Sequence, residues 1–298
     1  DGDLDAGGQY QWRRRGERHA YNPNTVAALQ HAVRAGSYAK FKEFSRRAND
    51  EAERLCTIRG LLTLKEGTPV PIDEVEACAR LALEHDVQLC VHAIGDRANR
   101  ETLDIFERFL PEGTADEGAE GEGGKADLRW RVEHAQHIHP DDLPRFAQLG
   151  VIAAMQGVHC TSDAPWVLRR LGPERAKSGA YMWRDLLDSG AVVTNGTDAP
   201  VEDLDPIASY YSTVTRKRAD GMVFFPGQRM TRMEALRSYT IACAYSAFEE
   251  DLKGSLEPGK LADVVVLSKD ILACPDDEIL DARVDLTVVG GEVLFQRD

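Results

Sequence analysis

Apolar residues recur along the chain at two spacings, which predict strands and helices. Four short apolar runs are typical of buried strands: 87–92, 128–134, 151–155 and 191–197. Apolar residues at helical spacing predict helices over three of the stretches between and around them: 97–110, 140–149 and 182–189. Strands that alternate with helices favour βα units and a parallel sheet. We therefore expect an α/β fold over the middle of the chain.

The N-terminal part has a different pattern. Residues 1–60 combine turn signals with two helical stretches, and a further helix is predicted to begin at Asp73. Residues 111–127 are acidic, rich in glycine and nearly free of apolar groups, which predicts a solvated loop. The sequence thus predicts a mainly helical and loop-containing segment ahead of the α/β region.

Towards the C-terminus a helix is followed by strands. Residues 231–247 predict a helix that begins with a capping box formed by Thr231 and Glu234. Apolar runs at 263–268 and 285–296 predict strands, with a hairpin turn at the Gly-Gly pair within the second run. These strands predict a small sheet that is separate from the α/β region.

Composition narrows the class of protein. The 298 residues carry a net charge of −14, which argues against a nucleic-acid surface, because phosphate contacts need clustered Lys and Arg. The apolar runs fall short of the ~20 residues that span a bilayer, and the N-terminus shows no secretion signal. The six cysteines are dispersed, which suits a reducing compartment. We expect a cytoplasmic protein that binds neither nucleic acid nor membranes, with homo-oligomerisation left open.

The charge is distributed unevenly. Residues 1–60 carry 11 Lys and Arg against 8 Asp and Glu, whereas the remainder carries 25 against 42. A basic segment joined to an acidic one is consistent with two modules of separate origin. One basic face or a chance fluctuation explains the charge difference equally well.

Three predicted strands end in a residue that can bind a metal ion. His92 and His134 end two of the strands, and Asp198 directly follows a third. The carboxyl ends of parallel strands lie on one face of a sheet, so these side chains are expected to converge. Two imidazoles and a carboxylate suit Zn²⁺ or a similar divalent ion. The competing interpretation, structural histidines and a helix-capping aspartate, is less able to explain all three positions together.

The remaining histidines give weaker signals. His137 and His139 form an H-x-H after a strand and before Pro140, which is typical of a solvated turn, although His137 is close enough to His134 to reach a substrate. His159 and Cys160 have no partner at metal-binding spacing and are interpreted as loop residues.

Three motifs in this region resemble the amidohydrolase superfamily. They are VHAIGDRA at 91–98, VEHAQ at 132–136 and NGTDAP at 195–200. The segment GSLEPGKLAD at 254–263 resembles the family's passage from the barrel into its flanking β-sandwich. The resemblance covers about residues 77–298 and is strongest to the family-3 branch that includes N-substituted formamide deformylases.

The resemblance implies a partial TIM-like (β/α) barrel with a β-sandwich remnant. It implies that His92, His134 and Asp198 bind a divalent metal ion, zinc being expected, and that Asp198 is the catalytic proton shuttle. The activity implied is hydrolysis of non-peptide C–N bonds in small amide-type molecules by metal-activated water. Asp96, Arg97 and His137 are candidates for substrate contact, with helix capping and salt bridges as the alternative for Asp96 and Arg97.

The sequence also departs from the family pattern. The family's H-x-H on the first barrel strand and its bridging residue on the fourth are not found before His92. Motifs at 7–14 (GGQYQWRR), 29–34 (LQHAVR) and 71–76 (PIDEVE) instead resemble the large subunit of glutamate synthase, without its catalytic residues. We therefore expect an apparent fusion: a glutamate synthase-like segment at 1–76, a partial barrel at 77–252 and the sandwich remnant at 253–298.

These departures lead us to expect impaired activity. Two alternatives stay open: an oxidoreductase fragment derived from glutamate synthase, which bound flavin would reveal, and a non-catalytic fusion protein.

Overall fold

The computed structural model describes residues 72–84, 88–110 and 127–298. The chain divides into two compact units, Asp1–Gln88 and Leu89–Asp298. In the first unit the described part is helix α3 (Ile72–Glu84), which confirms the helix predicted from Asp73. The elements predicted over residues 1–60 and most of the 111–127 loop lie outside the described residues. The domain boundaries expected after residues 76 and 252 stay predictions.

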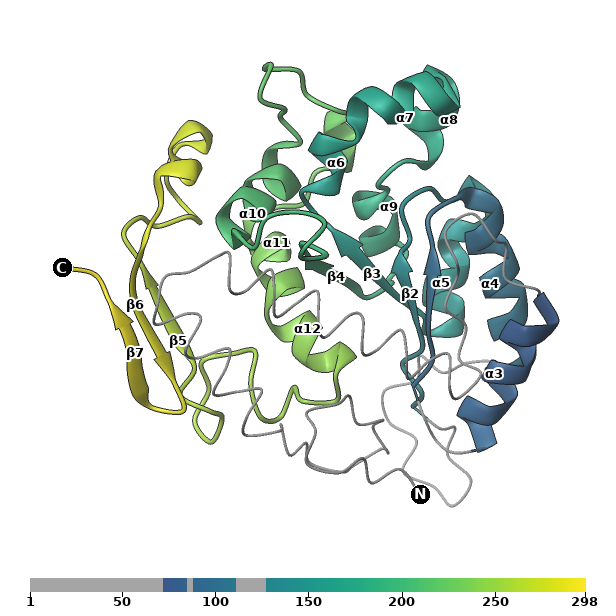
Figure 1. Cartoon of the computed structure of the whole chain (residues 1–298), viewed down its shortest axis with the longest axis horizontal. Helices are drawn as coiled ribbons and strands as arrows, with labels where there is room; N and C mark the ends of the chain where they lie inside the picture. Colours follow the sequence, from purple (N-terminus) through teal and green to yellow (C-terminus); the bar gives the residue numbers. More distant parts are fainter. Residues whose placement is uncertain (1–71, 85–87, 111–126) are drawn as a thin grey trace. The chain divides into compact units, whose positions relative to one another are not determined.

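The centre of the second unit is a parallel sheet of four strands (Figure 1). The strands are β1 (Cys90–Ala93), β2 (Arg131–His134), β3 (Ile152–Gln156) and β4 (Val193–Gly196). They lie in the order of the chain, and each pairs with the next in parallel. The expected α/β fold with a parallel sheet is confirmed, although β1, β2 and β4 are shorter than their apolar runs and β3 is shifted by one residue. Closure into a barrel stays a prediction.

Amphipathic helices pack beside the first strands. Helix α4 (Asp96–Phe109) follows β1, and the short 3-10 helix η1 (Pro140–Asp142) continues into α5 (Leu143–Leu149) after β2. The buried face of α4 includes Phe106, whose ring meets that of Trp130 edge-on with the centroids 5.0 Å apart. Such aromatic pairs stabilise the folded state by more than the burial of their apolar surface alone would.

The helix predicted over 231–247 is two helices. Helix α11 (Arg232–Tyr239) begins with the expected capping box of Thr231 and Glu234, and α12 (Ile241–Ser246) follows it. Thr240 separates them with φ −123° and ψ −95°, and its hydroxyl donates to the carbonyl oxygen of Leu236 at 2.8 Å. A threonine that bonds back to the preceding turn bends a helix, which accounts for the break.

Several short elements were not predicted. After β3 come α6 (His159–Ser162), α7 (Ala164–Leu171) and α8 (Pro173–Gly179), while α9 (Trp183–Asp188) matches the helical stretch predicted at 182–189. Helix α10 (Pro206–Thr215) and the 3-10 helix η2 (Pro226–Gln228) lie between β4 and α11. Proline stands in the first turn of α7, α8 and α10, where a helix tolerates it, although in sequence it resembles a breaker.

The predicted C-terminal sheet is confirmed as a separate antiparallel sheet. It contains β5 (Val264–Leu267), β6 (Val284–Val289) and β7 (Glu292–Gln296). Gly290 and Gly291 turn the β6–β7 hairpin with φ of 59° and 84°. The segment between β5 and β6 contains the 3-10 helix η3 (Asp276–Asp281) and contacts α11 through an ion pair from Arg232 to Asp276.

Among the described residues, no helix has the length and apolar character that crossing a membrane requires.

Candidate functional site

The structure brings the side chains of His92 and His134 together at the carboxyl ends of β1 and β2. Nδ1 of His92 lies 2.9 Å from Nε2 of His134, and the ring centroids are 5.0 Å apart. The two strands pair in parallel register, with Ala93 opposite His134, so their ends lie at the same edge of the sheet. The predicted convergence of the two imidazoles is therefore present in the fold.

Asp198 lies just beyond the end of β4. The negative charge of Asp198 is close enough to raise the pKa of both His92 and His159, which works against the lowering caused by burial. Both Asp198 and His134 have left-handed backbones, with φ of 53° and 73°. Left-handed conformations are uncommon for residues other than glycine, and they cluster where a fold holds functional side chains.

Gln156, the last residue of β3, was missed by the sequence analysis. Its Oε1 accepts a hydrogen bond from Nδ1 of His134 at 2.9 Å, while its Nε2 donates to the carbonyl oxygen of Ala154. With the His134 proton on Nδ1, the lone pair is on Nε2 and faces His92. The only signal in the sequence was the position of Gln156 at the end of a strand next to that of His134.

The structure corrects the interpretation of His159 and Cys160 as loop residues, because both lie in α6. His159 is the first residue of α6 and only 6% exposed, and its ring stacks on that of His134 at 6.1 Å between centroids. Its Nε2 is buried and has no hydrogen-bond partner. No spacing in the sequence connects His159 with His134; the adjacency of β2 and β3 brings them together.

The pKa values of His92 and His159 are both lowered. Partial burial, followed by the neighbouring His134 ring, lowers the pKa of His92. Burial likewise lowers the pKa of His159, while the carboxylates of Asp163, Asp198 and Glu202 oppose the shift. The imidazoles of His92 and His159 are therefore held in their neutral form, in which one ring nitrogen can accept a hydrogen bond or bind a metal ion.

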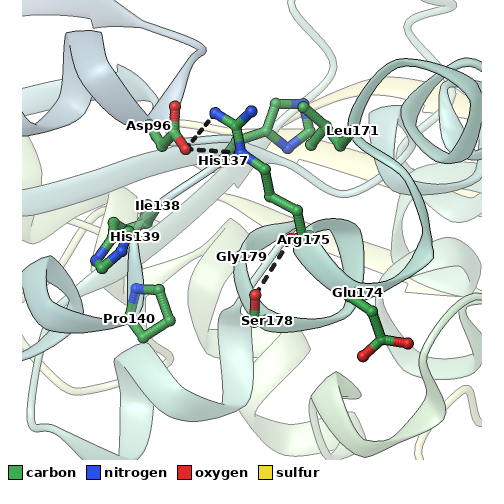
Figure 2. Close-up of a pocket in the computed structure, with 10 residues that line it drawn as sticks. All are labelled: Asp96, His137, Ile138, His139, Pro140, Leu171, Glu174, Arg175, Ser178 and Gly179. Carbon is green, nitrogen blue, oxygen red and sulfur yellow. Dashed lines mark hydrogen bonds and ion pairs between the residues drawn. The ribbon is translucent and has the colours of Figure 1, made fainter.

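A cavity of about 490 Å³ lies beside the segment that follows β2 (Figure 2). Asp96 and His137 line it, facing residues of α8. Arg175 of α8 donates two hydrogen bonds to Asp96 Oδ2 at 2.5 and 3.0 Å and so lowers the pKa of that carboxyl group. His137 is half-buried with an unpartnered Nδ1, and its backbone pairs with Ala180, so it is not the solvated turn residue that we expected.

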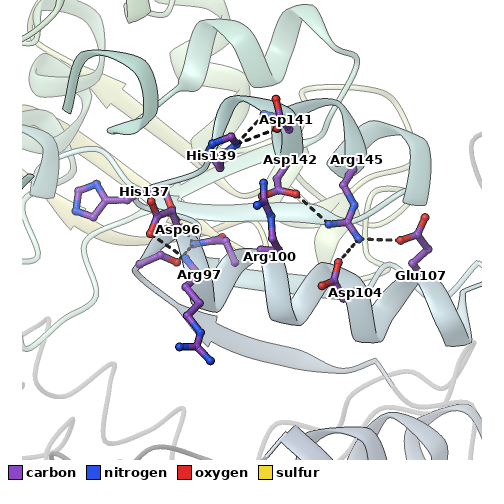
Figure 3. A network of polar contacts seen from close by, with 12 residues as sticks. Asp96, Arg97, Arg100, Asp104, Glu107, His137, His139, Asp141, Asp142 and Arg145 are labelled. Carbon is purple, nitrogen blue, oxygen red and sulfur yellow. Dashed lines mark hydrogen bonds and ion pairs between the residues drawn. The ribbon is translucent and has the colours of Figure 1, made fainter. Parts of the chain in front are cut away.

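The third candidate for substrate contact, Arg97, lies elsewhere. Its side chain points away from His137 (Figure 3) and pairs with Glu101 one turn along α4 at 2.6 Å. Figure 3 also shows Arg145 of α5 bridging to Asp104 and Glu107 of α4 at 2.7 and 2.8 Å. The polar groups on this side of α4 thus join two helices and lie apart from the cavity.

The donors of the His92–His134 pair suit a metal ion in chemistry. The imidazoles converge through Nδ1 of His92 and Nε2 of His134, and the hydrogen bond from His134 to Gln156 is the kind of support that metal-binding histidines have. Over 72–84, 88–110 and 127–298, however, no group of three or more His, Cys, Asp or Glu is close enough together to hold an ion. Two imidazole nitrogens converge, and the charge of Asp198 is close enough to act on His92.

Comparison with known proteins identifies the family of the chain. Residues 15–295 match the model of the amidohydrolase family. The match therefore begins well before residue 77 and extends into the glutamate synthase-like segment. That segment is supported separately by 39% identity over 75 residues to a glutamate synthase large chain of Azospirillum brasilense, which covers 25% of this chain and 5% of that one.

The matches to individual relatives cover most of this chain and a smaller share of each relative. Protein LONG AFTER FAR-RED 3 of Arabidopsis thaliana is 37% identical over 213 residues, covering 70% of this chain and 34% of that protein. An N-substituted formamide deformylase of Arthrobacter pascens is 28% identical over 225 residues, with shares of 75% and 39%. The chain thus spans between a third and two fifths of these relatives.

Solved structures give the same result. An uncharacterized metal-dependent hydrolase from Pyrococcus furiosus superposes with a TM-score of 0.56 at 33% identity, covering 68% of this chain and 38% of that one. The parallel sheet, the two histidines at its edge and the match over residues 15–295 lead to one conclusion: this chain is a member of the amidohydrolase family.

Proposed function

We propose that the unit 89–298 carries the centre of a metal-dependent hydrolase that cleaves non-peptide C–N bonds in small amide-type molecules. The observation that carries this proposal is the convergence of His92 and His134 at 2.9 Å beside Gln156, at the carboxyl edge of a parallel sheet. The similarity to an N-substituted formamide deformylase supports amides as the substrate class.

In this proposal His92 and His134 hold the ion, zinc being our choice because imidazole and carboxylate are its usual ligands. A divalent ion bound there lowers the pKa of water to about 7 and polarises a carbonyl group. Gln156 keeps Nε2 of His134 free of its proton. Asp198 supplies a carboxylate as a third donor to this ion.

Asp198 also moves the proton. One of its carboxylate oxygens takes a proton from the attacking water and passes it to the amide nitrogen, which leaves as an amine. Asp96 and His137 contact the substrate from the cavity that they line. The pairing of Arg97 with Glu101 gives no support to a role for Arg97 in binding.

We also propose that the activity of this chain is weak. The described residues gather two imidazole nitrogens and place one carboxylate near them, without a cluster of three donors. An ion held by so few groups exchanges readily with water, so the affinity is expected to be below that of a site with a full ligand set. The dispersed positions of the six cysteines along the sequence support our proposal of a reducing, cytoplasmic location.

Calorimetric titration with Zn²⁺ and hydrolysis of N-butylformamide, followed by amine release, test the function together. We expect zinc binding that disappears in His92→Ala and slow amine release that disappears in Asp198→Asn. Asp203→Asn, a change at an exposed aspartate, serves as the matched control and is expected to retain both. Zinc binding in the absence of amine release from any N-substituted formamide would contradict the hydrolase, and flavin absorbance in the purified chain would favour the oxidoreductase alternative.

A further inference from the structure

His159 has a buried polar atom that the fold leaves unpaired. The residue is 6% exposed, yet its Nε2 has no hydrogen-bond partner. Leaving a buried donor or acceptor unsatisfied costs ~1–3 kcal/mol, so native structures rarely do so without a reason. A ligand that supplies the missing partner is one such reason.

The position of His159 makes a ligand the more specific explanation. Its ring lies nearly parallel to that of His134, at 22° and 6.1 Å between centroids, and within electrostatic reach of Asp198. His134 Nε2 and the Asp198 carboxylate accept hydrogen bonds or bind cations. A carbonyl group held beside them needs a hydrogen-bond donor, which neither residue supplies.

The turn that carries His159 is held rigidly. A Cβ on Gly157 would collide with the hydroxyl groups of Thr213 and Tyr239, so only glycine fits there. The amide of the next residue, Val158, donates to Ser209 Oγ at 3.2 Å, and that hydroxyl contacts Tyr239 OH at 2.7 Å. Hydroxyl groups of α10 and α11 thus fix the main chain just before the imidazole, as preorganised binding groups require.

We propose that His159 Nε2–H donates a hydrogen bond to the carbonyl oxygen of the amide substrate, an assignment that rests on the proposed hydrolase function. When the oxygen of water bonds to the carbonyl carbon, the π electron pair of the C=O bond moves onto the carbonyl oxygen. When the C–N bond breaks, the pair returns and the nitrogen leaves with the proton from Asp198. A donor aimed at this oxygen in a buried site stabilises the charge that develops on it.

The test uses the full chain, labelled with ¹⁵N, in the presence of Zn²⁺, with N-butylformamide as the probe. The His159 imidazole signal is assigned by its loss in His159→Gln, and binding is followed through the His134 imidazole. We expect the His159 Nε2 resonance to shift on saturation. We expect His159→Phe, which removes the donor, to weaken the binding of N-butylformamide about five- to ten-fold, as the loss of one hydrogen bond would. His159→Gln, which places an amide donor near the same point, is expected to stay within about three-fold.

Zinc titration of the same variants separates this role from others. The assignment requires zinc affinity to stay unchanged in His159→Phe; a loss would make His159 a metal ligand and overturn it. Unchanged amide binding in His159→Phe, or no amide binding by the unsubstituted chain, also overturns it. Amine release measured in parallel tests the hydrolase separately: amide binding that depends on His159 without any turnover would contradict the hydrolase and leave the contact in place.

Discussion

At the scale of single residues, His134 depends on its neighbour across the sheet. The hydrogen bond to Gln156 fixes which ring nitrogen of His134 carries the proton. Partners of this kind set the tautomer and the orientation of metal-binding histidines, and their loss typically lowers metal affinity about 10- to 100-fold. Gln156 is therefore the residue through which metal affinity can be altered without touching a donor.

Replacing Gln156 tests this dependence. We expect Gln156→Leu to weaken zinc binding about 10- to 100-fold in calorimetric titration, because the His134 ring loses the acceptor that holds its Nδ1 proton. Gln156→Glu is the matched control, since its carboxylate still accepts this bond, and zinc affinity is expected to be retained or raised. Equal zinc affinity in all three proteins would show that the His134 tautomer does not limit binding.

The residues of the site differed in how far the sequence could predict them. His92, His134 and Asp198 could be proposed from the sequence because they stand at the end of an apolar run or directly after one, and a parallel sheet brings such ends to one edge. Gln156 and His159 were missed because each is relevant only through its contact with His134. No periodic pattern in a single sequence reveals such a contact. Their chemistry is visible only once β2 and β3 are paired.

At the scale of elements, helix α11 combines a capping box with an ion pair to another helix. Both carboxylate oxygens of Glu234 accept from Arg184 of α9, at 2.8 and 2.9 Å, and the same side chain closes the box with Thr231. The hydrogen bonds from Arg184, and then those from Thr231, lower the pKa of Glu234 to about 2. The charged form of Glu234 therefore stabilises the folded state.

The pH dependence of this contribution is open to measurement. Since the folded pKa of Glu234 is depressed, its stabilisation is complete above its ordinary pKa of 4.5 and is lost as the pH falls towards about 2. We expect Glu234→Gln to reduce the free energy of unfolding in urea by about 1–2 kcal/mol at pH 7, a value discounted for partial exposure, and by progressively less below pH ~4.5.

An exposed ion pair provides the control for this variant. Glu107, which is 60% exposed in its pair with Arg145, is expected to lose less than about 0.5 kcal/mol when changed to Gln. A deficit in Glu234→Gln that stays constant between pH 7 and pH 3 would show that the carboxylate charge is not the stabilising feature.

The elements that could be predicted were those whose pattern is long or repeated. The four strands and helices α4, α5 and α9 follow from apolar spacing, and the capping box of α11 follows from two residues. Helices α7, α8 and α10 were missed because they are short and have proline in the first turn. The break between α11 and α12 goes with one hydrogen bond, from the Thr240 hydroxyl to the carbonyl oxygen of Leu236. The spacing of apolar residues does not predict such a bond.

At the scale of the whole molecule, the second compact unit contains both described sheets. The second unit begins at Leu89, whereas the resemblances meet near residue 76, and the family match begins at residue 15. The sequence could not predict the unit boundary because compactness depends on contacts between distant residues. Among the described residues, the second unit has buried apolar side chains that include Trp130, Phe106 and Trp183.

We therefore expect residues 89–298 to fold without the preceding segment. This fragment should show one cooperative thermal transition by circular dichroism, within about 4 °C of the main transition of the full chain, a difference of roughly 1–2 kcal/mol. A fragment of 127–298, which lacks β1 and α4, is the control and should unfold at much lower temperature. The absence of a cooperative transition in 89–298 would show that its stability depends on residues before Leu89.

The succession of the strands has a consequence for how the polypeptide reaches its native state. Each strand of the parallel sheet lies beside the strand that precedes it in the chain. During synthesis, the strand with which a new strand pairs has therefore already left the ribosome. Each pairing joins successive strands only, as in Cys90 with Arg131 and Arg131 with Ile152, so no strand has to wait for one that is made later. The sheet can thus grow during synthesis, one β-strand and helix at a time, and the imidazole pair is assembled as early as the second step.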